Sequence, residues 1–289
     1  MSEREWLAER FEEHRTRLRA VAYRMLGSLS EADDAVQEAW LRLDRTDVSD
    51  VRNLRGWLTT VVARICLDTL RARSAHPEQP LDETVSDHVA RDAVDPEQEA
   101  ELADSIGVAL LVILQTLSPA ERLAFVLHDM FDLPFAEIAP IVGRSENTAA
   151  QLAARARRRV RGKTPEPASD FVRQRQLVEA FLTAARDGDF NALLAVLDSD
   201  VVLHVDAAAA GSDRTIRGAR DVATNAQMFS ANARFAEPVL VDGAVGILVA
   251  PQGRLAIVLR FTVVGDTIAE IDIAADPQRL RRFSLAMLD

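Results

Sequence analysis

A mixed polar and aromatic stripe runs along the segment that follows Arg52. A helix turning about 100° per residue places one set of side chains on a single face: Asn53, Trp57, Thr60, Arg64, Asp68 and Arg71. A second set falls roughly opposite: Leu58, Val62, Ile65 and Thr69. Arginine, amide, hydroxyl and indole groups on one face can stack on exposed bases and contact backbone phosphates. The competing interpretation is that Trp57 belongs to the core and that the arginines are solvated.

Residues 134–161 carry the pattern of a helix-turn-helix. Pro134 begins a short helix, Gly143 stands where the sharp turn needs a positive φ, and Ser145 can cap a second helix. Pro140 predicts that the first helix is bent or short. The second helix has an apolar stripe that we expect to be buried: Ala149, Leu152, Ala153, Ala156 and Val160. Its outward positions are Asn147, Gln151, Ala154, Arg155 and Arg158.

The second helix of this pattern favours DNA binding over a plain helical hairpin. Its first turns are slim enough for a major groove, and its end carries arginines that suit phosphates. Few long polar side chains project from its start, which predicts modest base reading there.

An acidic helix face is predicted within SEADDAVQEAWLRLD, residues 30–44. Helical spacing puts Val36, Ala39, Trp40 and Leu43 on one side, and places on another side Asp33, Asp34, Gln37 and Glu38. Such a face either is merely solvated or binds a partner.

His204 and Asp206 form the single closely spaced pair that could do acid–base work in residues 164–289. They lie two apart on a predicted strand, so both side chains would face the same side. Because that part of the chain has no second histidine, we predict no catalytic residue and keep the two as candidate pocket residues. No spacing typical of metal ligands or of a glycine-rich phosphate loop is present, so neither a metal nor a cofactor is predicted.

Composition limits the classes of protein to consider. The chain has 289 residues, 48% of them hydrophobic, 34 Lys+Arg, 45 Asp+Glu, one Cys and a net charge of -11. It can build sizeable cores, whereas Cys66 alone excludes an intrachain disulfide or a Cys-rich zinc site. No uncharged apolar run approaches the ~20 residues of a membrane span, and the amino terminus lacks the apolar segment of a signal peptide. We therefore expect a cytoplasmic protein that does not bind membranes.

Five segments follow from periodicity and charge. Helical spacing without Pro indicates an all-α domain over 1–75, and an acidic linker follows over 76–104. A second all-α domain with the helix-turn-helix spans 105–163, and 164–170 forms a short linker. Residues 171–289 combine one amphipathic helix with Val- and Ile-rich segments between turns, which predicts an α+β domain.

These segments carry a resemblance to a known family. YRMLGSLSEADDAVQEAWLRL followed by RGWLTTVVARICLDTLRAR resembles region 2 of an extracytoplasmic-function (ECF) sigma factor. LSPAERLAFVLHDMFDLPFAEIAPIVGRSENTAAQLAARARRRV resembles region 4. RQLVEAFLTAARDGDFNALLAVLDSDVVLHVD resembles the opening of a SnoaL-like domain, a cone-shaped α+β fold with a curved sheet around a pocket. The whole is similar to the group of ECF sigma factors that carry such a C-terminal domain.

The resemblance implies partners and roles. Core RNA polymerase would be bound through its β′ clamp helices and its β flap, with the clamp helices meeting the acidic face of Asp33, Asp34, Gln37 and Glu38. The stripe from Asn53 to Arg71 would melt and read the minus-ten element of promoter DNA. The helix from Ser145 would read the minus-thirty-five element, and the C-terminal domain would contact region 2 or region 4 and modulate activity.

The chain departs from the family at several positions. Many relatives carry basic side chains where Ala150 and Leu152 stand, so Gln151 and Arg155 would carry more of the base contacts. The group's Asp-Gly-Gly-Gly-Lys signature appears only as the stretch from Asp206 to Gly211.

Two other classes of protein remain open at this point. A helix-turn-helix repressor with a ligand-sensing domain would leave the acidic helix and the Trp57 stripe without a purpose. A cyclase-type enzyme would explain only the last 126 residues.

Overall fold

The computed structural model describes residues 3–46, 53–75, 107–162, 168–228 and 233–288. The described residues form two compact units. One comprises residues 3–75 and 114–158, and the other comprises residues 107–113 and 159–288. The predicted linker 76–104 and the first part of the predicted linker 164–170 lie outside the described residues.

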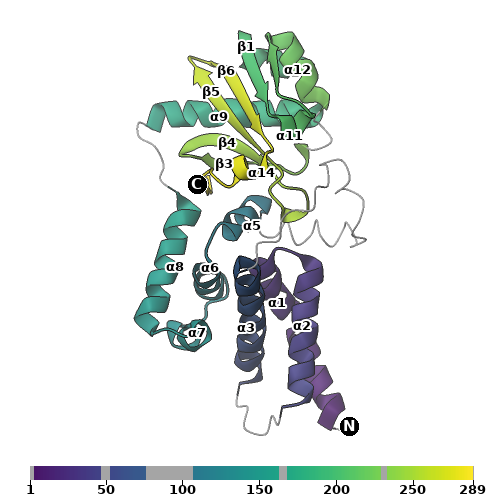
Figure 1. Ribbon diagram of the computed structural model, residues 1–289, viewed down its shortest axis with the longest axis vertical. Helices are drawn as coiled ribbons and strands as arrows, with labels where there is room; N and C mark the ends of the chain where they lie inside the picture. The colour runs from purple at the N-terminus through teal and green to yellow at the C-terminus, as the bar shows by residue number, and fades with distance from the viewer. Residues whose placement is uncertain (1–2, 47–52, 76–106, 163–167, 229–232, 289) are drawn as a thin grey trace. The chain divides into compact units, whose positions relative to one another are not determined.

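Three long helices begin the first unit: α1 (Glu3–Leu26), α2 (Leu29–Asp44) and α3 (Leu54–Ala75), which pack side by side (Figure 1). Polar side chains set where they start. Ser28 Oγ accepts the Glu31 N–H at 3.5 Å, and Asn53 Oδ1 accepts the Gly56 N–H at 3.0 Å, so each satisfies a free donor of a first turn. The helices bury their apolar faces on one another, with Leu18, Leu43 and Leu58 almost fully enclosed.

Further helices follow: α6 (Pro119–Phe125), a π-helical turn η1 (Val126–Met130), α7 (Phe135–Val142) and α8 (Glu146–Arg161). They belong to the first unit as far as Arg158, and the last three residues of α8 belong to the second. Ser118 and Glu121 form a capping box at the start of α6. Gly143 ends α7 with a φ of 72°, the left-handed conformation expected there. Pro140 lies inside α7, which has only eight residues, as predicted. The helix that precedes α6, α5 (Val108–Gln115), has residues in both units.

A buried arginine joins α6 to α1. Arg122 is 3% exposed, and its Nε donates to the carbonyl oxygen of Arg24 at 3.1 Å. Burial lowers the pKa of its guanidinium to about 10; the nearby Cys66 raises it and Arg73 lowers it further. The first unit therefore encloses a cation within its core.

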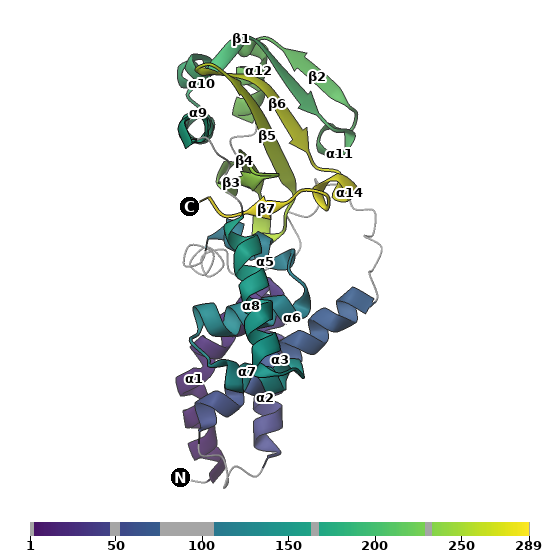
Figure 2. The same ribbon diagram turned by 90° about the vertical axis from the view of Figure 1, so that its left-hand side faces the viewer.

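The second unit contains a curved seven-stranded sheet in the order β2-β1-β6-β5-β4-β3-β7 (Figure 2). Its long strands are β1 (Leu197–Val205), β5 (Ile257–Val264) and β6 (Thr267–Ala274). The shorter strands are β2 (Arg214–Arg217), β3 (Ala236–Val241), β4 (Ala244–Val249) and β7 (Leu285–Ala286). All neighbouring strands are antiparallel except β1 and β6, which are parallel.

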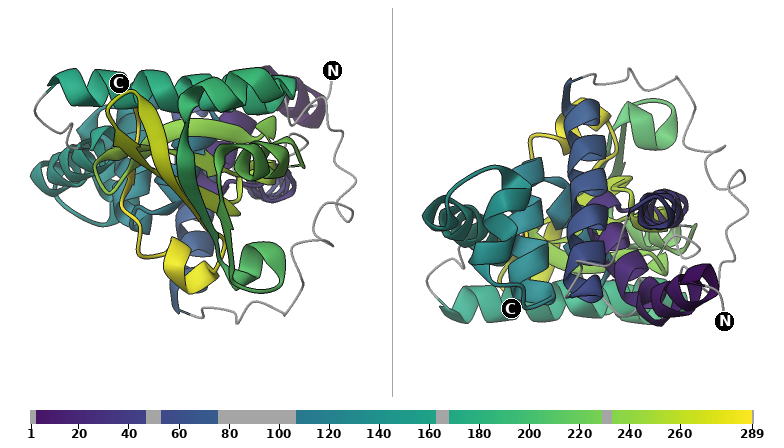
Figure 3. Two further views of the ribbon diagram at one scale, coloured as in Figure 1. Left: turned by 90° about the horizontal axis from the view of Figure 1, so that it is seen from above. Right: turned by 90° about the horizontal axis from the view of Figure 1, so that it is seen from below.

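Helices pack on the sheet of the second unit: α9 (Ala168–Asp187), α10 (Phe190–Val196) and α12 (Ala219–Met228). The long α9 lies across the strands in the left view of Figure 3. Phe181 of α9 packs against Phe261 of β5, with ring centroids 5.4 Å apart. Two short helices, α11 (Ala207–Ala210) and α14 (Pro277–Leu280), and one 3₁₀ turn, η2 (Pro251–Gly253), complete the unit. The predicted fold class, two all-α parts followed by an α+β part with a curved sheet, is confirmed.

Candidate functional site

The helix α8 presents the surface predicted to read DNA. Ser145 Oγ accepts the Thr148 N–H at 3.3 Å, so the predicted cap is present. The predicted apolar stripe is buried throughout, at Ala149, Leu152, Ala153, Ala156 and Val160. The candidate contacts are exposed: Ser145, Asn147, Gln151, Arg155 and Arg158. The fold therefore presents these side chains together on one helix face.

The arginines of α8 differ in how firmly the protein holds them. Arg157 makes a two-pronged ion pair with Asp129, at 2.7 and 3.2 Å, and the hydrogen bond to that carboxylate raises its pKa. Arg155 Nε lies 3.8 Å from Glu121 Oε1, a looser contact, and Arg158 Nε donates to its own helix at Ala154 O, 3.4 Å away. Arg155 and Arg158 can therefore be redirected toward an external anion more easily than Arg157.

The turn before α8 carries an exposed arginine that the sequence interpretation did not single out. Arg144 follows Gly143 and donates its backbone N–H to Ala139 O at 3.0 Å, which fixes its backbone at the turn. Its proximity in sequence to Ser145 is the signal that could have identified it.

The beginning of α3 shows two candidate residues engaged in local bonds. The Asn53 side chain caps the helix, and Thr60 Oγ1 donates to Gly56 O at 2.9 Å. Trp57 is half-buried, so its side chain is neither enclosed in the core nor fully exposed to solvent.

The arginines of the α3 stripe are both exposed. Arg64 makes no hydrogen bond or ion pair with any residue that the structure describes. Arg71 lies 3.7 Å from Asp68 and donates to Val142 O, at the end of α7, at 3.5 Å. Within the first unit, Arg71 is thus bound to the helix-turn-helix and would have to leave it to contact DNA.

The predicted acidic face of α2 is exposed at all four positions. Two of its carboxylates are paired within the chain: Asp33 with Arg19 at 2.8 Å, and Glu38 with Arg42 at 3.0 Å. Asp34 and Gln37 make no side-chain bond to the residues that the structure describes, so they are the freest to bind a partner.

An exposed leucine interrupts this acidic face. Leu41 is 40% exposed, and it lies seven residues after Asp34 and four after Gln37, which is the spacing of one helix face. The sequence interpretation missed it, although the same spacing rule would have placed it there. Partner interfaces are typically built around an apolar side chain with a polar rim, so Leu41 belongs to the candidate interface.

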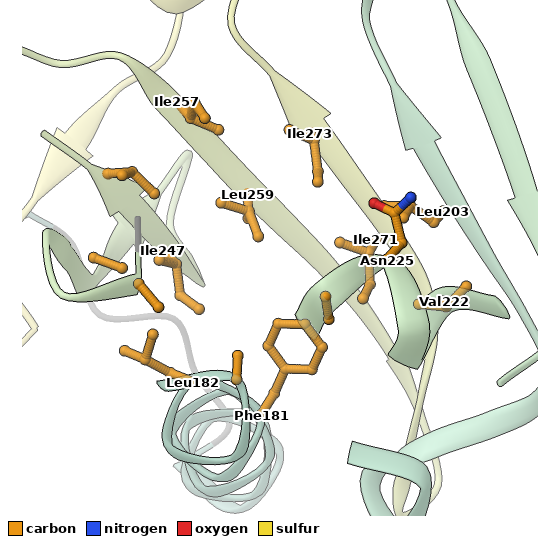
Figure 4. A pocket seen from close by; sticks show the side chains of 15 residues that line it. Phe181, Leu182, Leu203, Val222, Asn225, Ile247, Ile257, Leu259, Ile271 and Ile273 are labelled. Carbon is orange, nitrogen blue, oxygen red and sulfur yellow. The ribbon is translucent and has the colours of Figure 1, made fainter. Parts of the chain in front are cut away.

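His204 and Asp206 do not line the cavity found in the described part of the second unit. Side chains alternate along a strand, and Leu203 faces that cavity, so His204 points to the opposite side of the sheet. There its Nδ1 lies 3.3 Å from Thr215 Oγ1 and its Nε2 lies 3.5 Å from Glu270 Oε1. His204 thus lies outside the lining of this cavity, whose side chains Figure 4 shows.

Asp206 has a structural role, because its carboxylate accepts hydrogen bonds from the backbone. Its Oδ1 accepts the Ala209 N–H at 3.0 Å at the start of α11, and its Oδ2 accepts the N–H groups of Ala275 and Asp276 at 2.8 and 3.0 Å. Ala209 follows β1 in the chain, and Ala275 and Asp276 follow β6. By accepting from all three N–H groups, the Asp206 carboxylate connects the two segments that follow these strands.

Neither a metal centre nor a membrane helix is found in the described residues. Nowhere in the ranges given above are three His, Cys, Asp or Glu side chains grouped so as to hold a metal ion. No helix in the described part of the chain is long and apolar enough to cross a membrane.

Comparison with known families matches the two helical parts of the chain. The Sigma-70 region 2 family matches residues 10–76, and the Sigma-70 region 4 family matches residues 107–160. These matches and the helix-turn-helix geometry define the class: a sigma factor of the sigma-70 type.

Comparison with whole relatives gives the family. The chain is 34% identical over 286 residues to the probable ECF RNA polymerase sigma factor SigI of Mycobacterium tuberculosis, covering 97% of each chain. It is 38% identical over 224 residues to the ECF RNA polymerase sigma factor SigJ of the same organism, covering 72% of this chain and 70% of SigJ. The chain belongs to the ECF RNA polymerase sigma factor family.

A crystal structure of Mycobacterium tuberculosis SigJ is also similar. It covers 94% of this chain and 98% of its own, at 29% identity and a TM-score of 0.46.

Proposed function

We propose that this protein is an alternative sigma factor that binds core RNA polymerase, recognises promoter DNA and initiates transcription under the control of its C-terminal domain. The observation that carries the proposal is a capped helix-turn-helix, with its polar face exposed, on the same chain as the exposed acidic face of α2. We assign region 2 to residues 1–75, region 4 to 105–163 and the SnoaL-like regulatory domain to 171–289.

The proposal places polymerase binding on α2. Asp34, Gln37 and Leu41 form the accessible centre of its outer face, while Asp33 and Glu38 are held by arginines of this chain. A partner with basic helices would complement this face. Because polymerase and DNA meet in the cytoplasm, we place the protein there.

A charge reversal tests the polymerase contact. Asp34→Lys should weaken binding to core polymerase by about tenfold or more, because a like charge then opposes the basic partner. Glu9→Lys on α1 is the matched control, since Glu9 is also exposed and has no partner among the described residues. Equal affinity of the two variants, measured by fluorescence anisotropy of labelled protein titrated with core polymerase, would contradict the assignment.

The proposed control by the C-terminal domain rests on contacts inside the second unit. Both carboxylate oxygens of Glu237, on β3, accept N–H groups of the first turn of α5, from Val108 and Ala109, each at 2.9 Å. The Met287 N–H donates to Val160 O, at the end of α8, at 2.7 Å. The two ends of the region 4 segment are thus bonded to residues of the C-terminal domain, Glu237 on β3 and Met287 directly after β7.

Loss of the Glu237 contact should change promoter activity. Glu237→Ala removes two charge-assisted bonds, so region 4 is released more easily and the yield of promoter transcripts rises by about threefold or more. Glu270→Ala is the control, because this carboxylate lies on β6 of the same sheet and its contact is with His204. Equal run-off transcript yields from wild type and Glu237→Ala would overturn control through this contact.

The proposal includes no catalytic step. The candidate pair His204 and Asp206 lies away from the cavity, and Asp206 is occupied by backbone donors. Turnover that is abolished by His204→Ala would contradict this part of the proposal.

A further inference from the structure

A polar cleft of about 190 Å³ lies within the first unit, between the end of α3 and the start of α6. The last turns of α3 contribute Arg73 and Ser74 to its lining, the last residue of α5 contributes Gln115, and α6 contributes Arg122. Two arginines and no carboxylate are thus among the residues that line the cleft. The contacts with DNA and polymerase proposed above involve none of these four residues.

Arg122 is a buried cation without an anionic partner in the described part of the chain. Its side chain is 3% exposed, and its Nε donates to the carbonyl oxygen of Arg24 at 3.1 Å. Nη2 is buried with no hydrogen-bond partner, and Nη1 makes no hydrogen bond or ion pair with a described residue. The guanidinium keeps its charge near neutral pH, because burial lowers its pKa only to about 10. Since buried charges in proteins are paired, this one favours an anion in the adjoining cleft.

Arg73 brings a second positive charge to the same cleft. Its side chain is exposed and forms an ion pair with Glu31 of α2, which offsets part of that charge. Arg73 is close enough to Arg122 to lower the pKa of that guanidinium as well, although burial is the larger cause. An anion bound between the two arginines would attract both and would offset their mutual repulsion.

Two neutral side chains can donate hydrogen bonds to the same anion. Ser74 Oγ donates to Leu70 O of its own helix at 2.9 Å, and rotation of the hydroxyl can redirect this bond. The Gln115 carboxamide carries two N–H donors. A volume of about 190 Å³ is many times the roughly 10–15 Å³ that one water needs, so a polyatomic anion fits. Because the guanidinium fork matches the oxygens of phosphate, a phosphate group suits the cleft better than a halide.

We propose that this cleft is a binding site for a phosphate group, held by Arg73 and Arg122 and hydrogen-bonded by Ser74 and Gln115. The group belongs either to free phosphate or to a small phosphate ester, which share this chemistry. It would connect α3, in the segment matched to region 2, with α6, in the segment matched to region 4. The inference does not depend on the proposed sigma-factor function, because it concerns binding alone.

Calorimetric titration of the full chain tests the proposal, in phosphate-free buffer near neutral pH and at constant ionic strength. The probes are inorganic phosphate, glycerol 3-phosphate and chloride. At least one phosphate probe should bind saturably and at least about tenfold more tightly than chloride, because only an oxyanion accepts several bonds from both arginines. The tighter of the two phosphate probes identifies the source of the group, and either result supports the proposal. Binding of both phosphate probes no tighter than that of chloride would overturn it.

Arg73→Gln locates the site. The variant removes one charge and leaves a polar side chain, so the phosphate probes should bind at least about tenfold more weakly. Arg45→Gln is the matched control, since Arg45 is an exposed arginine at the end of α2 and lies outside the lining. Phosphate that binds Arg73→Gln as tightly as wild type would occupy another part of the surface, which would refute the assignment.

Two further variants change the affinity in opposite directions. Arg122→Met removes the buried charge, so phosphate should bind at least about tenfold more weakly. Glu31→Gln removes the carboxylate that competes for Arg73, so phosphate should bind about threefold or more tightly, a gain that damage to the fold would not produce. Unchanged affinity in Glu31→Gln would contradict the role of Arg73. Far-ultraviolet circular dichroism checks folding, and if Arg122→Met fails to fold, the Arg73→Gln and Glu31→Gln results decide.

Discussion

Replacing Arg122 by Met should stabilise the first unit. The guanidinium is buried where α6 meets α1 and α3, and its Nη2 has no hydrogen-bond partner among the described residues. Burial lowers its pKa from the ordinary value of an arginine to about 10, which corresponds to roughly 3 kcal/mol of unfavourable free energy for keeping the charge. Met fills a similar volume and removes that cost.

The variant also loses a favourable contact. Nε of Arg122 donates to Arg24 O at 3.1 Å, and a bond from a charged donor contributes about 1.5–3 kcal/mol. Because this loss offsets most of the gain, we expect a net increase of about 1 kcal/mol in the free energy of unfolding. Replacement of a buried charge by an apolar side chain is often neutral or stabilising for the same reason.

The effect depends on pH in a defined direction. Below about pH 10 Arg122 is charged in both the folded and the unfolded chain, and the cost of burial is fully present. As the pH rises above about 10, the unfolded chain binds more protons than the folded one, so the wild type gains stability relative to the variant. The difference between the two proteins should therefore shrink in that range.

Urea unfolding of the full chain measures the difference, with the first-unit transition followed by its tryptophan fluorescence. Arg10→Met, at an exposed arginine that pairs with Glu13 and lies over the exposed Trp6 ring, is the control and should change stability by less than about 0.5 kcal/mol. A loss of more than about 2 kcal/mol in Arg122→Met near neutral pH would refute the reasoning, as would a difference that does not shrink at high pH.

Three further predictions concern single residues. Burial raises the pKa of the Cys66 thiol to about 12, so the folded chain should not react with a thiol reagent near pH 8, and rapid reaction before unfolding would contradict this. Asp206→Ala should lower the free energy of unfolding of the second unit by about 1–3 kcal/mol, because three backbone donors lose their acceptor; an unchanged urea midpoint would refute that role. Arg155→Ala should weaken promoter binding by about 1–3 kcal/mol, and only for promoters that carry one particular base at the contacted position. An equal loss of binding free energy on all promoter sequences would mean that Arg155 contacts only phosphate.

The helix-turn-helix could be predicted from the sequence because local chemistry determines it. Gly143 was expected to have a positive φ and has one, and Ser145 caps α8 as expected. The buried and exposed faces of α8 follow from spacing alone. Each of these features depends on residues only a few positions apart.

Features that depend on distant segments could not be predicted. The bond from Arg71 to Val142 and the burial of Arg122 beside Arg24 join residues 71 and 98 positions apart. The face of β1 on which His204 lies could not be predicted for another reason: strand alternation gives two faces, but the sequence does not say which face meets a cavity. Only the packing of α9 and α12 on one side of the sheet decides that.

The most direct test of the central claim is promoter-selective transcription by the full chain. Purified protein is added to core RNA polymerase on a promoter library, and run-off transcripts are sequenced. The account predicts transcripts that start at a common promoter class and that fall about tenfold or more with Asp34→Lys but not with Glu9→Lys. The absence of promoter-selective transcripts, together with stable binding of DNA without polymerase, would contradict the account and favour a repressor.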